Sequence, residues 1–183
     1  MKVLLVRHGE TEENYLGKIQ GRNNVFLNDT GRRQVKRLKD KINSIEVDRC
    51  FISPLIRCFE TALVLVGDRV EIVRDDRLIQ REMGELTGRE VAEYNAYQFW
   101  DYDKNRSDYG IESIHDLFDR CSSFIDYLYD NYSDETILIV THGEVYRALR
   151  YIINGTKLNG KLLDGEIGYC KLEELSYKEW YYD

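Results

Sequence analysis

The chain has 183 residues, of which 43% are apolar and 32% are charged, and it contains one proline. This composition excludes a disordered or low-complexity protein, and the length fits one domain with a single core. Acidic residues outnumber basic ones by 33 to 26, which argues against a broad surface for nucleic acid or for an anionic membrane.

The first predicted element is a strand at Val3 to Val6. These residues form a continuous run of Val and Leu, which is typical of a strand buried on both faces of a parallel sheet. Arg7 and His8 interrupt the apolar run too early for a signal peptide or a membrane span. We therefore expect a cytoplasmic protein.

An amphipathic helix is predicted from Thr30 to Asn43. Within it Val35, Leu38 and Ile42 recur at spacings of three and four among basic residues, so one face is apolar and the other is charged. The pattern indicates a helix that packs on a core along one side.

A second strand at Arg49 to Ile52 leads into a second helix, predicted from Pro54 to Val66. Ser53 is expected to be the N-cap residue, with Pro54 at the first helical position. A cluster of polar side chains therefore follows this strand directly.

The middle of the chain predicts a short strand at Glu71 to Val73 and helices at Arg89 to Trp100 and Ile114 to Tyr132. The polar stretch from Asp101 to Gly110 joins the two helices, and we interpret it as a mobile lid. Aromatic residues crowd the segment from Tyr94 to Tyr102, and we expect a few of them to contact the organic part of a substrate.

A fourth strand is predicted at Thr136 to Val140, followed by His142-Gly143 and a further helical pattern. The tail from Ile167 to Tyr182 alternates and predicts a hairpin. Strands that alternate with helices indicate an α/β fold with a central, mostly parallel sheet flanked by helices. No repeat or linker divides the chain, so residues 1–183 are expected to form a single domain.

Polar clusters follow three of the predicted strands: Arg7-His8, Ser53 to Arg57, and His142-Gly143. The carboxyl ends of parallel strands meet at one edge of a sheet, so these clusters should converge. Guanidinium groups match phosphate oxygens, imidazole can attack phosphorus, and helix N-termini at Ser53 and near Glu144 would add N–H donors. The combination predicts a site for a phosphoryl group.

Five segments carry a resemblance to a known family. The sequence resembles the histidine phosphatase superfamily, which includes phosphoglycerate mutases and many small phosphatases, and the resemblance covers most of the chain. The matching segments are RHGETEEN at 7–14, QGRNNVFLNDTGRRQ at 20–34, SPLIRCFETA at 53–62, REMGELTG at 81–88 and THGEVYRAL at 141–149.

The resemblance implies roles for individual residues. His8 would be the nucleophile that becomes phosphohistidine, while Arg7, Arg57 and His142 would hold the phosphoryl group and stabilise its transition state. Further positions that match the entrance of the phosphate and substrate site, or that allow the backbone to approach closely, are Asn14, Gln20, Gly21 and Gly143.

The proton donor to the leaving oxygen is the point where the sequence departs from the family. The family's glutamate usually lies four residues before the glycine that matches Gly84, and here that position is Gln80, which cannot exchange a proton. Glu82 would point to the same side of an extended segment and is the first choice as donor. Glu85 is a further candidate.

The favoured function is hydrolysis of a small phosphorylated metabolite, that is, a phosphomonoesterase that needs no metal and no cofactor. A phosphoglycerate mutase would have to protect its phosphohistidine from water, and a silent phosphate-binding domain would explain Gln80. Neither a nucleic acid nor a membrane is expected as a partner. The oligomeric state is open, and a homodimer is one option.

Two other residue types receive plain structural interpretations. The cysteines are widely spaced without a C-x-x-C pair, which favours reduced, mostly structural thiols. Cys58 beside Arg57 is interpreted as a buried thiol on a helix rather than as a redox sensor. His115, early in a predicted helix, is expected to have no chemical role.

Overall fold

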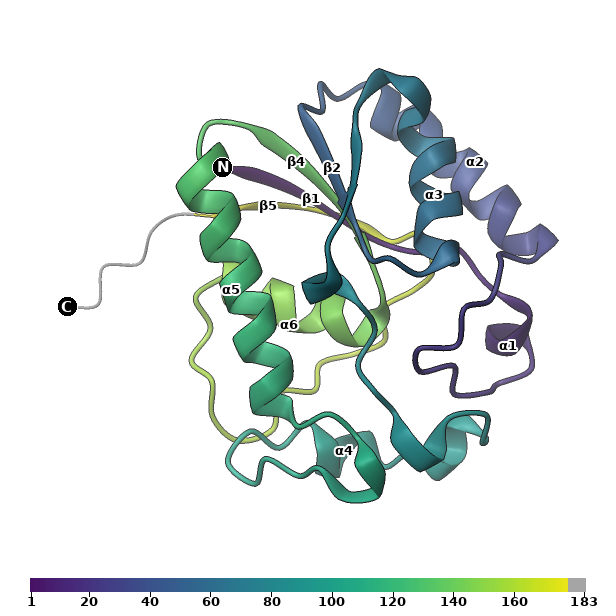
Figure 1. Cartoon of the computed structure of the whole chain (residues 1–183), viewed down its shortest axis with the longest axis vertical. Coiled ribbons are helices and arrows are strands. Elements are labelled where there is room, and N and C mark those ends of the chain that lie inside the picture. The colour runs from purple at the N-terminus through teal and green to yellow at the C-terminus, as the bar shows by residue number, and fades with distance from the viewer. Residues whose placement is uncertain (178–183) are drawn as a thin grey trace.

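The computed structural model describes residues 1–177, and its strands and helices alternate along the chain (Figure 1). The strands are β1 (Lys2–Arg7), β2 (Arg49–Ile52), β3 (Ile72–Arg74), β4 (Thr136–Thr141) and β5 (Leu172–Ser176). The helices are α1 (Glu12–Tyr15), α2 (Asp29–Asn43), α3 (Ile56–Val66), α4 (Ala96–Phe99), α5 (Ile114–Tyr132) and α6 (Gly143–Ile153). Short 3₁₀ turns lie at Gly67–Arg69, Asp76–Leu78, Gly84–Leu86, Val91–Glu93 and Asp108–Gly110.

The strands form one sheet in the order β3-β2-β4-β1-β5. The first four strands in this order are mutually parallel, and β5 pairs antiparallel to β1 at the edge. The prediction of an α/β fold with a mostly parallel central sheet is therefore confirmed. The strand order places β1, β4 and β2 side by side, so their carboxyl ends adjoin.

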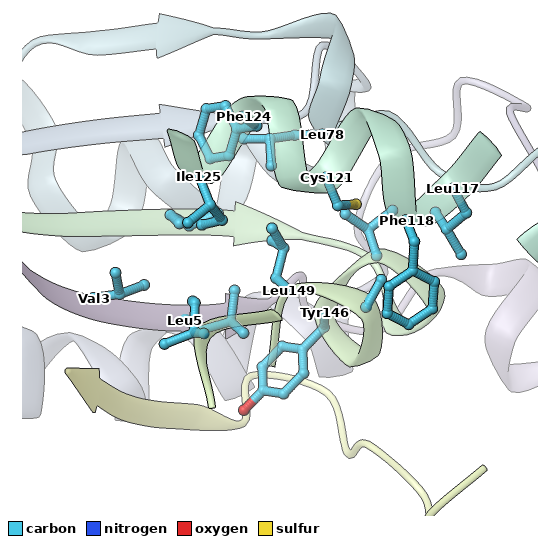
Figure 2. Close-up of a cluster of buried hydrophobic side chains, with 14 of the residues drawn as sticks. Val3, Leu5, Leu78, Leu117, Phe118, Cys121, Phe124, Ile125, Tyr146 and Leu149 are labelled. Carbon is cyan, nitrogen blue, oxygen red and sulfur yellow. The ribbon is translucent and has the colours of Figure 1, made fainter. Parts of the chain in front are cut away.

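Both faces of the sheet are covered, because the central strands are apolar throughout. Val3 and Leu5 of β1 are fully buried toward α5 and α6, in the cluster drawn in Figure 2. Leu4 and Val6 are equally buried in the opposite cluster, against α2 and α3. Each such side chain contributes about 1.5–3 kcal/mol by leaving water.

The two long amphipathic helices closely follow their predictions. α2 begins one residue earlier than expected, where Asn28 Oδ1 accepts a hydrogen bond from Gly31 N at 2.7 Å. α5 has the predicted bounds, with Ser113 as its N-cap. Gly31 is required at its position, since a Cβ there would lie 2.1 Å from the carbonyl oxygen of Glu10. Its lack of a side chain lets the loop after β1 run against α2.

The start of α3 differs from the prediction. The helix begins at Ile56 rather than Pro54, and its N-cap, Leu55, makes no side-chain cap bond. Ser53 Oγ instead lies 2.7 Å from His142 Nε2. The hydroxyl that local pattern assigned to capping thus makes its shorter contact with a residue far along the chain, although Ser53 Oγ also accepts from Leu55 N at 3.4 Å.

The segment from Arg89 to Trp100 is not the single helix that was predicted. It contains only the turn at Val91–Glu93 and the one-turn helix α4. Backbone hydrogen bonds from Val91 N to Gly17 O, at 2.8 Å, and from Ile19 N to Arg89 O, at 2.9 Å, tie the segment to an N-terminal loop. A continuous helix would use Arg89 O to accept from Glu93 N, whereas here Arg89 O accepts from Ile19 N.

The predicted C-terminal hairpin does not form among the described residues. Residues 172–176 make one strand, whose partner is β1 at the sheet edge rather than a second strand of the tail. The remainder of that prediction, residues 178–182, lies outside the described residues. Between Met1 and Tyr177 the structure contains no helix of the length and apolarity that crossing a bilayer requires.

Candidate active site

A cavity of about 630 Å³ opens at the carboxyl ends of the central strands. His8 N donates to Thr141 O at 3.0 Å, and Ser53 N donates to Val140 O at 3.1 Å, so the three strand ends are held side by side. The cavity is in the size range of small-molecule sites. Among its lining residues are Arg7, His8, Asn14, Gln20, Gly21, Arg57, Gln80, Gly143 and Glu144.

His8 is oriented by its own backbone neighbour. The side chain is only 3% exposed, and its Nδ1 lies 2.7 Å from Gly9 O. A carbonyl oxygen can only accept, so Nδ1 carries the proton and Nε2 keeps a free lone pair. Burial, reinforced by the charges of Arg57 and Arg7, holds the pKa of His8 well below 6.5. The imidazole is therefore neutral at physiological pH and can act as a nucleophile.

Arg57 is only 1% exposed, and three hydrogen bonds hold its guanidinium group in place. Nε donates to His142 Nδ1 at 3.2 Å, while Nη1 and Nη2 donate to the carbonyl oxygens of Asn23 and Gly21 at 2.7 and 3.1 Å. A guanidinium carries five N–H groups, so these bonds leave others for a ligand in the cavity. The residue supplies a rigid positive charge.

Arg7 approaches the cavity from the end of β1. Nη1 donates to Ile167 O, and Cζ lies 4.1 Å from the centre of the Tyr169 ring. The buried Nε has no hydrogen-bond partner among the described residues. A buried donor without a partner is costly, and a phosphoryl oxygen is the kind of acceptor that would satisfy it.

His142 lies directly behind His8 rather than in the cavity wall. Its ring is fully buried, with its centre 5.1 Å from that of His8. Nδ1 accepts from Arg57, so Nε2 carries the proton and donates to Ser53 Oγ. Burial, followed by the charges of Arg57, His8 and Arg7, lowers the pKa of His142 well below 6.5. In this arrangement His142 orients Arg57 and packs against His8.

The predicted entrance residues all lie in the cavity wall. Asn14 Oδ1 accepts from Thr11 N at 3.1 Å, and the buried Gln20 Oε1 has no partner among the described residues. Gly21 has φ +50°, and its carbonyl oxygen accepts a hydrogen bond from Arg57 Nη2. At Gly143 a Cβ would lie 3.5 Å from Arg7 Cζ, so the glycine keeps the space beside this arginine open.

The structure does not bring Glu82 to the cavity. Its Oε1 accepts from Met83 N and Gly84 N, both at 3.0 Å, and its Oε2 lies 3.7 Å from Arg22 Nε. Glu85 is exposed and also lies outside the lining residues, whereas Gln80 is among them. Because the chain turns after Glu82, the N–H groups of Met83 and Gly84 both point at the Glu82 carboxylate. In the extended segment that was predicted, the carboxylate would not meet these two N–H groups.

The sequence analysis predicted a helix N-terminus near Glu144 but did not predict a role for the Glu144 carboxylate. Glu144 lines the cavity, and its Oε2 accepts hydrogen bonds from Arg81 Nη1 at 3.2 Å, Tyr94 OH at 3.3 Å and Trp100 Nε1 at 2.9 Å. These partners come from separate segments. No local pattern in the sequence links them.

The predicted lid is wrong. None of the residues 101–110 lines the cavity. Tyr102 N donates to Gly160 O at 2.7 Å, and Asn105 Oδ1 accepts from His115 N at 2.9 Å, so this stretch packs against the start of α5 and the loop after α6. The cavity wall instead includes Val91, Tyr94, Ala96 and Tyr97, together with Leu163 and residues 165–169. Two of the aromatic side chains expected near a substrate are thus at the cavity.

Metal ligands of the usual kinds do not cluster in the part of the chain that the structure describes: no group of three or more His, Cys, Asp or Glu side chains is arranged to hold an ion. Positive charge at the cavity comes from the guanidinium groups of Arg7, Arg57 and Arg147 and from the ammonium group of Lys18. Such a set of residues suits an anion rather than a cation.

Comparisons with known proteins agree with this geometry. Residues 3–182 match the family described as histidine phosphatase superfamily (branch 1). Phosphoglycerate mutase-like protein 4 of Arabidopsis thaliana is 34% identical over 158 residues, covering 81% of this chain and 69% of the relative. Phosphoserine phosphatase 1 of Hydrogenobacter thermophilus is 27% identical, covering 87% of this chain and 79% of the relative. The solved structure of mycobacterial glucosyl-3-phosphoglycerate phosphatase shares the fold, with a TM-score of 0.85, 22% identity and coverage of 96% and 92%.

Proposed function

This chain belongs to the histidine phosphatase superfamily, and we propose from that premise that it hydrolyses phosphomonoesters of small metabolites through a phosphohistidine at His8. The observation that carries the proposal is the neutral imidazole of His8 at the cavity wall, with Nδ1 engaged by Gly9 O and two guanidinium groups beside it. The relatives named as phosphatases and the fit of the cavity to a small organic phosphate support the same activity.

The reaction has two displacements at phosphorus. In the first, His8 Nε2 attacks, an N–P bond forms and the P–O bond to the organic group breaks. In the second, water attacks the phosphohistidine, the N–P bond breaks and inorganic phosphate leaves. Arg7 and Arg57 stabilise the charge on the phosphoryl oxygens in both transition states, which is the main catalytic effect in this chemistry.

The remaining residues take supporting roles. His142 fixes the orientation of Arg57 and holds the place behind the nucleophile. Asn14, Gln20, Gly21 and Gly143 contact the phosphoryl group and the start of the organic part. Glu82 stays a prediction as proton donor, and its bonds to Met83 N and Gly84 N count against it.

The proposal also covers the metal requirement, the domain organisation and the location of the protein. The reaction needs no metal, because the two arginines supply the positive charge at the phosphoryl oxygens. The whole chain, residues 1–183, acts as a single domain, and the protein works in the cytoplasm. A mutase is the weaker alternative, since the stretch that was expected to close over a phosphohistidine, 101–110, does not line the cavity.

The test is phosphate release from a panel of phosphomonoesters, including phosphoserine and 3-phosphoglycerate, with a chelator present. The wild type and the matched control His115→Ala, whose ring packs on Tyr102 away from the cavity, should both release phosphate. His8→Ala should be at least about 10⁴-fold slower. Isomerisation of 3-phosphoglycerate without release would indicate a mutase, and silence of the wild type would indicate a phosphate-binding domain.

A further inference from the structure

We propose that Glu144 is the residue that transfers protons in this site, a role that rests on the proposed hydrolysis at His8. The first step needs a proton for the leaving oxygen, and the second needs a base for the attacking water. A carboxyl group at the cavity can serve both steps in turn.

Only two carboxylates are among the cavity-lining residues that the structure describes, Glu144 and Glu166. Glu166 is exposed in the loop before β5, and no hydrogen bond orients its side chain among the described residues. Glu144 stands in the first turn of α6, two residues after His142, and its side chain is 19% exposed. It is therefore the carboxylate that the fold holds still beside the phosphoryl site.

The hydrogen bonds of Glu144 leave one oxygen available for chemistry. Arg81, Tyr94 and Trp100 all donate to Oε2. Among the described residues none donates to Oε1, so this oxygen is the one free to give or accept a proton. Three donors from separate segments fix the carboxyl plane, which is the positioning that proton transfer requires.

Glu144 lines the same cavity as Arg7, His8 and Arg57. Burial lowers the pKa of Arg7, while Tyr169 and then Glu144 act in the opposite direction. The cavity wall includes Arg7, Gly143 and Glu144, and a Cβ added at Gly143 would lie 3.5 Å from Arg7 Cζ. The carboxyl group thus shares the cavity with a residue of the phosphoryl clamp.

The two oxygens of Glu144 have different surroundings. Oε2 is paired with Arg81 Nη1 at 3.2 Å, whereas Oε1 accepts no hydrogen bond among the described residues. The first step begins with the carboxyl group protonated on Oε1. The proton then passes from Oε1 to the leaving oxygen as the P–O bond breaks, and the alcohol departs neutral.

The second step returns the proton. Water attacks the phosphohistidine, its oxygen bonds to phosphorus as the N–P bond breaks, and one of its protons passes to the Glu144 carboxylate. His8 regains its lone pair, and phosphate leaves. Over the two steps one water is consumed and one alcohol and one phosphate are formed, so the carboxyl group ends in the state in which it began.

The test compares Glu144→Gln with the wild type on esters whose leaving groups differ in acidity. Glutamine can still accept from Arg81 and Trp100, so the fold should be kept, and circular dichroism and the melting temperature check this. For alkyl phosphates, whose leaving oxygen needs a proton, kcat should fall by about 10²-fold or more with little change in KM. For p-nitrophenyl phosphate, the first step should be nearly unaffected, and rapid quenching should reveal accumulated phosphoenzyme.

The matched control is Glu46→Gln, at an exposed carboxylate outside the cavity, which should stay within about threefold of the wild type on every ester. Glu82→Gln and Glu166→Gln test the competing carboxylates, and each should lose far less alkyl phosphatase activity than Glu144→Gln. Gln80→Glu in the Glu144→Gln background should restore part of the alkyl phosphatase activity. Equal losses of the first-step rate on all esters, measured by rapid quenching before the first turnover is complete, or no loss on any ester, would overturn the role of Glu144. A large loss in Glu82→Gln instead would assign the proton to that residue. The proposed function fails separately, by full activity in His8→Ala.

Discussion

Arg57 Nε lies 3.2 Å from His142 Nδ1, and this contact fixes the state of both side chains. Arginine is always a donor, so the histidine nitrogen must accept and its proton must lie on Nε2. That proton is directed to Ser53 Oγ at 2.7 Å. Residues that follow two different strands are thereby joined in one buried chain of hydrogen bonds beside His8.

We expect Arg57→Lys to lower kcat/KM by about 10²- to 10³-fold, because a single ammonium group cannot reach His142, Asn23 O and Gly21 O together. Phosphate release under the conditions used for the wild type measures the loss. Arg33→Lys, at an exposed arginine of α2, is the matched control and should leave kcat/KM unchanged. Near-normal activity of Arg57→Lys would mean that Arg57 does not clamp the phosphoryl group.

The pH dependence should follow from the lowered pKa of His8. Between pH 7.5 and about 6 the ring stays neutral, since its pKa lies well below 6.5, so the nucleophile is not lost in that range. The ring proton resonances of His8 and His142, assigned with His8→Ala and His142→Ala, should not titrate there. A midpoint near 6.5 for His8 would contradict the buried environment described above.

The same shifts predict a loss of stability in acid. In the unfolded chain both histidines bind protons as the pH falls below 6.5, whereas in the folded chain they remain neutral to lower pH. The unfolded state then holds more protons, so the free energy of unfolding decreases as the pH drops below 6.5. Urea unfolding at pH 7.5 and pH 5.5 measures the difference, and the difference should shrink when His142 is replaced by Asn.

Thiol reagents should not inhibit the enzyme. Burial raises the pKa of Cys58 to about 12, and that of Cys50 and Cys121 to about 12 as well, so none of these thiols is ionised at neutral pH. After iodoacetamide treatment at pH 7.5, mass spectrometry should find these three residues unmodified and phosphate release intact. Alkylation of Cys58, whose Sγ lies 3.6 Å from His142 Nε2, with loss of activity would instead support a redox-sensing role.

Gly31→Ala should destabilise the fold although alanine favours helices. A Cβ at this position would meet Glu10 O at 2.1 Å and Glu10 N at 2.7 Å, so the loop after β1 must move. We expect a loss of about 1–3 kcal/mol, seen as a melting temperature several degrees lower. Gly168→Ala, where a Cβ would have nothing within 4 Å, is the control for stability. Equal melting temperatures for the two variants would contradict the predicted clash.

The sequence alone was sufficient for the central sheet and for the convergence of Arg7, His8 and His142 at one edge of it. The run from Val3 to Val6 has no polar residue to place in water, so it has to be covered on both faces, as it is. Arg7, His8 and His142 directly follow such strands, and parallel neighbours align their carboxyl ends. Their meeting at one edge therefore follows from strand type and order, which short stretches of sequence encode.

Only the tertiary structure decided the positions of Glu82 and Glu144 and which segments line the cavity. The bonds from Ile19 N to Arg89 O and from Tyr102 N to Gly160 O hold these two segments in conformations other than the helix and the lid that local pattern predicted. The Glu144 carboxylate is held by Arg81 and Trp100, which lie 63 and 44 residues away in the chain. Hydrogen bonds over such separations depend on how the whole chain packs, and periodicity and spacing along the sequence do not encode them.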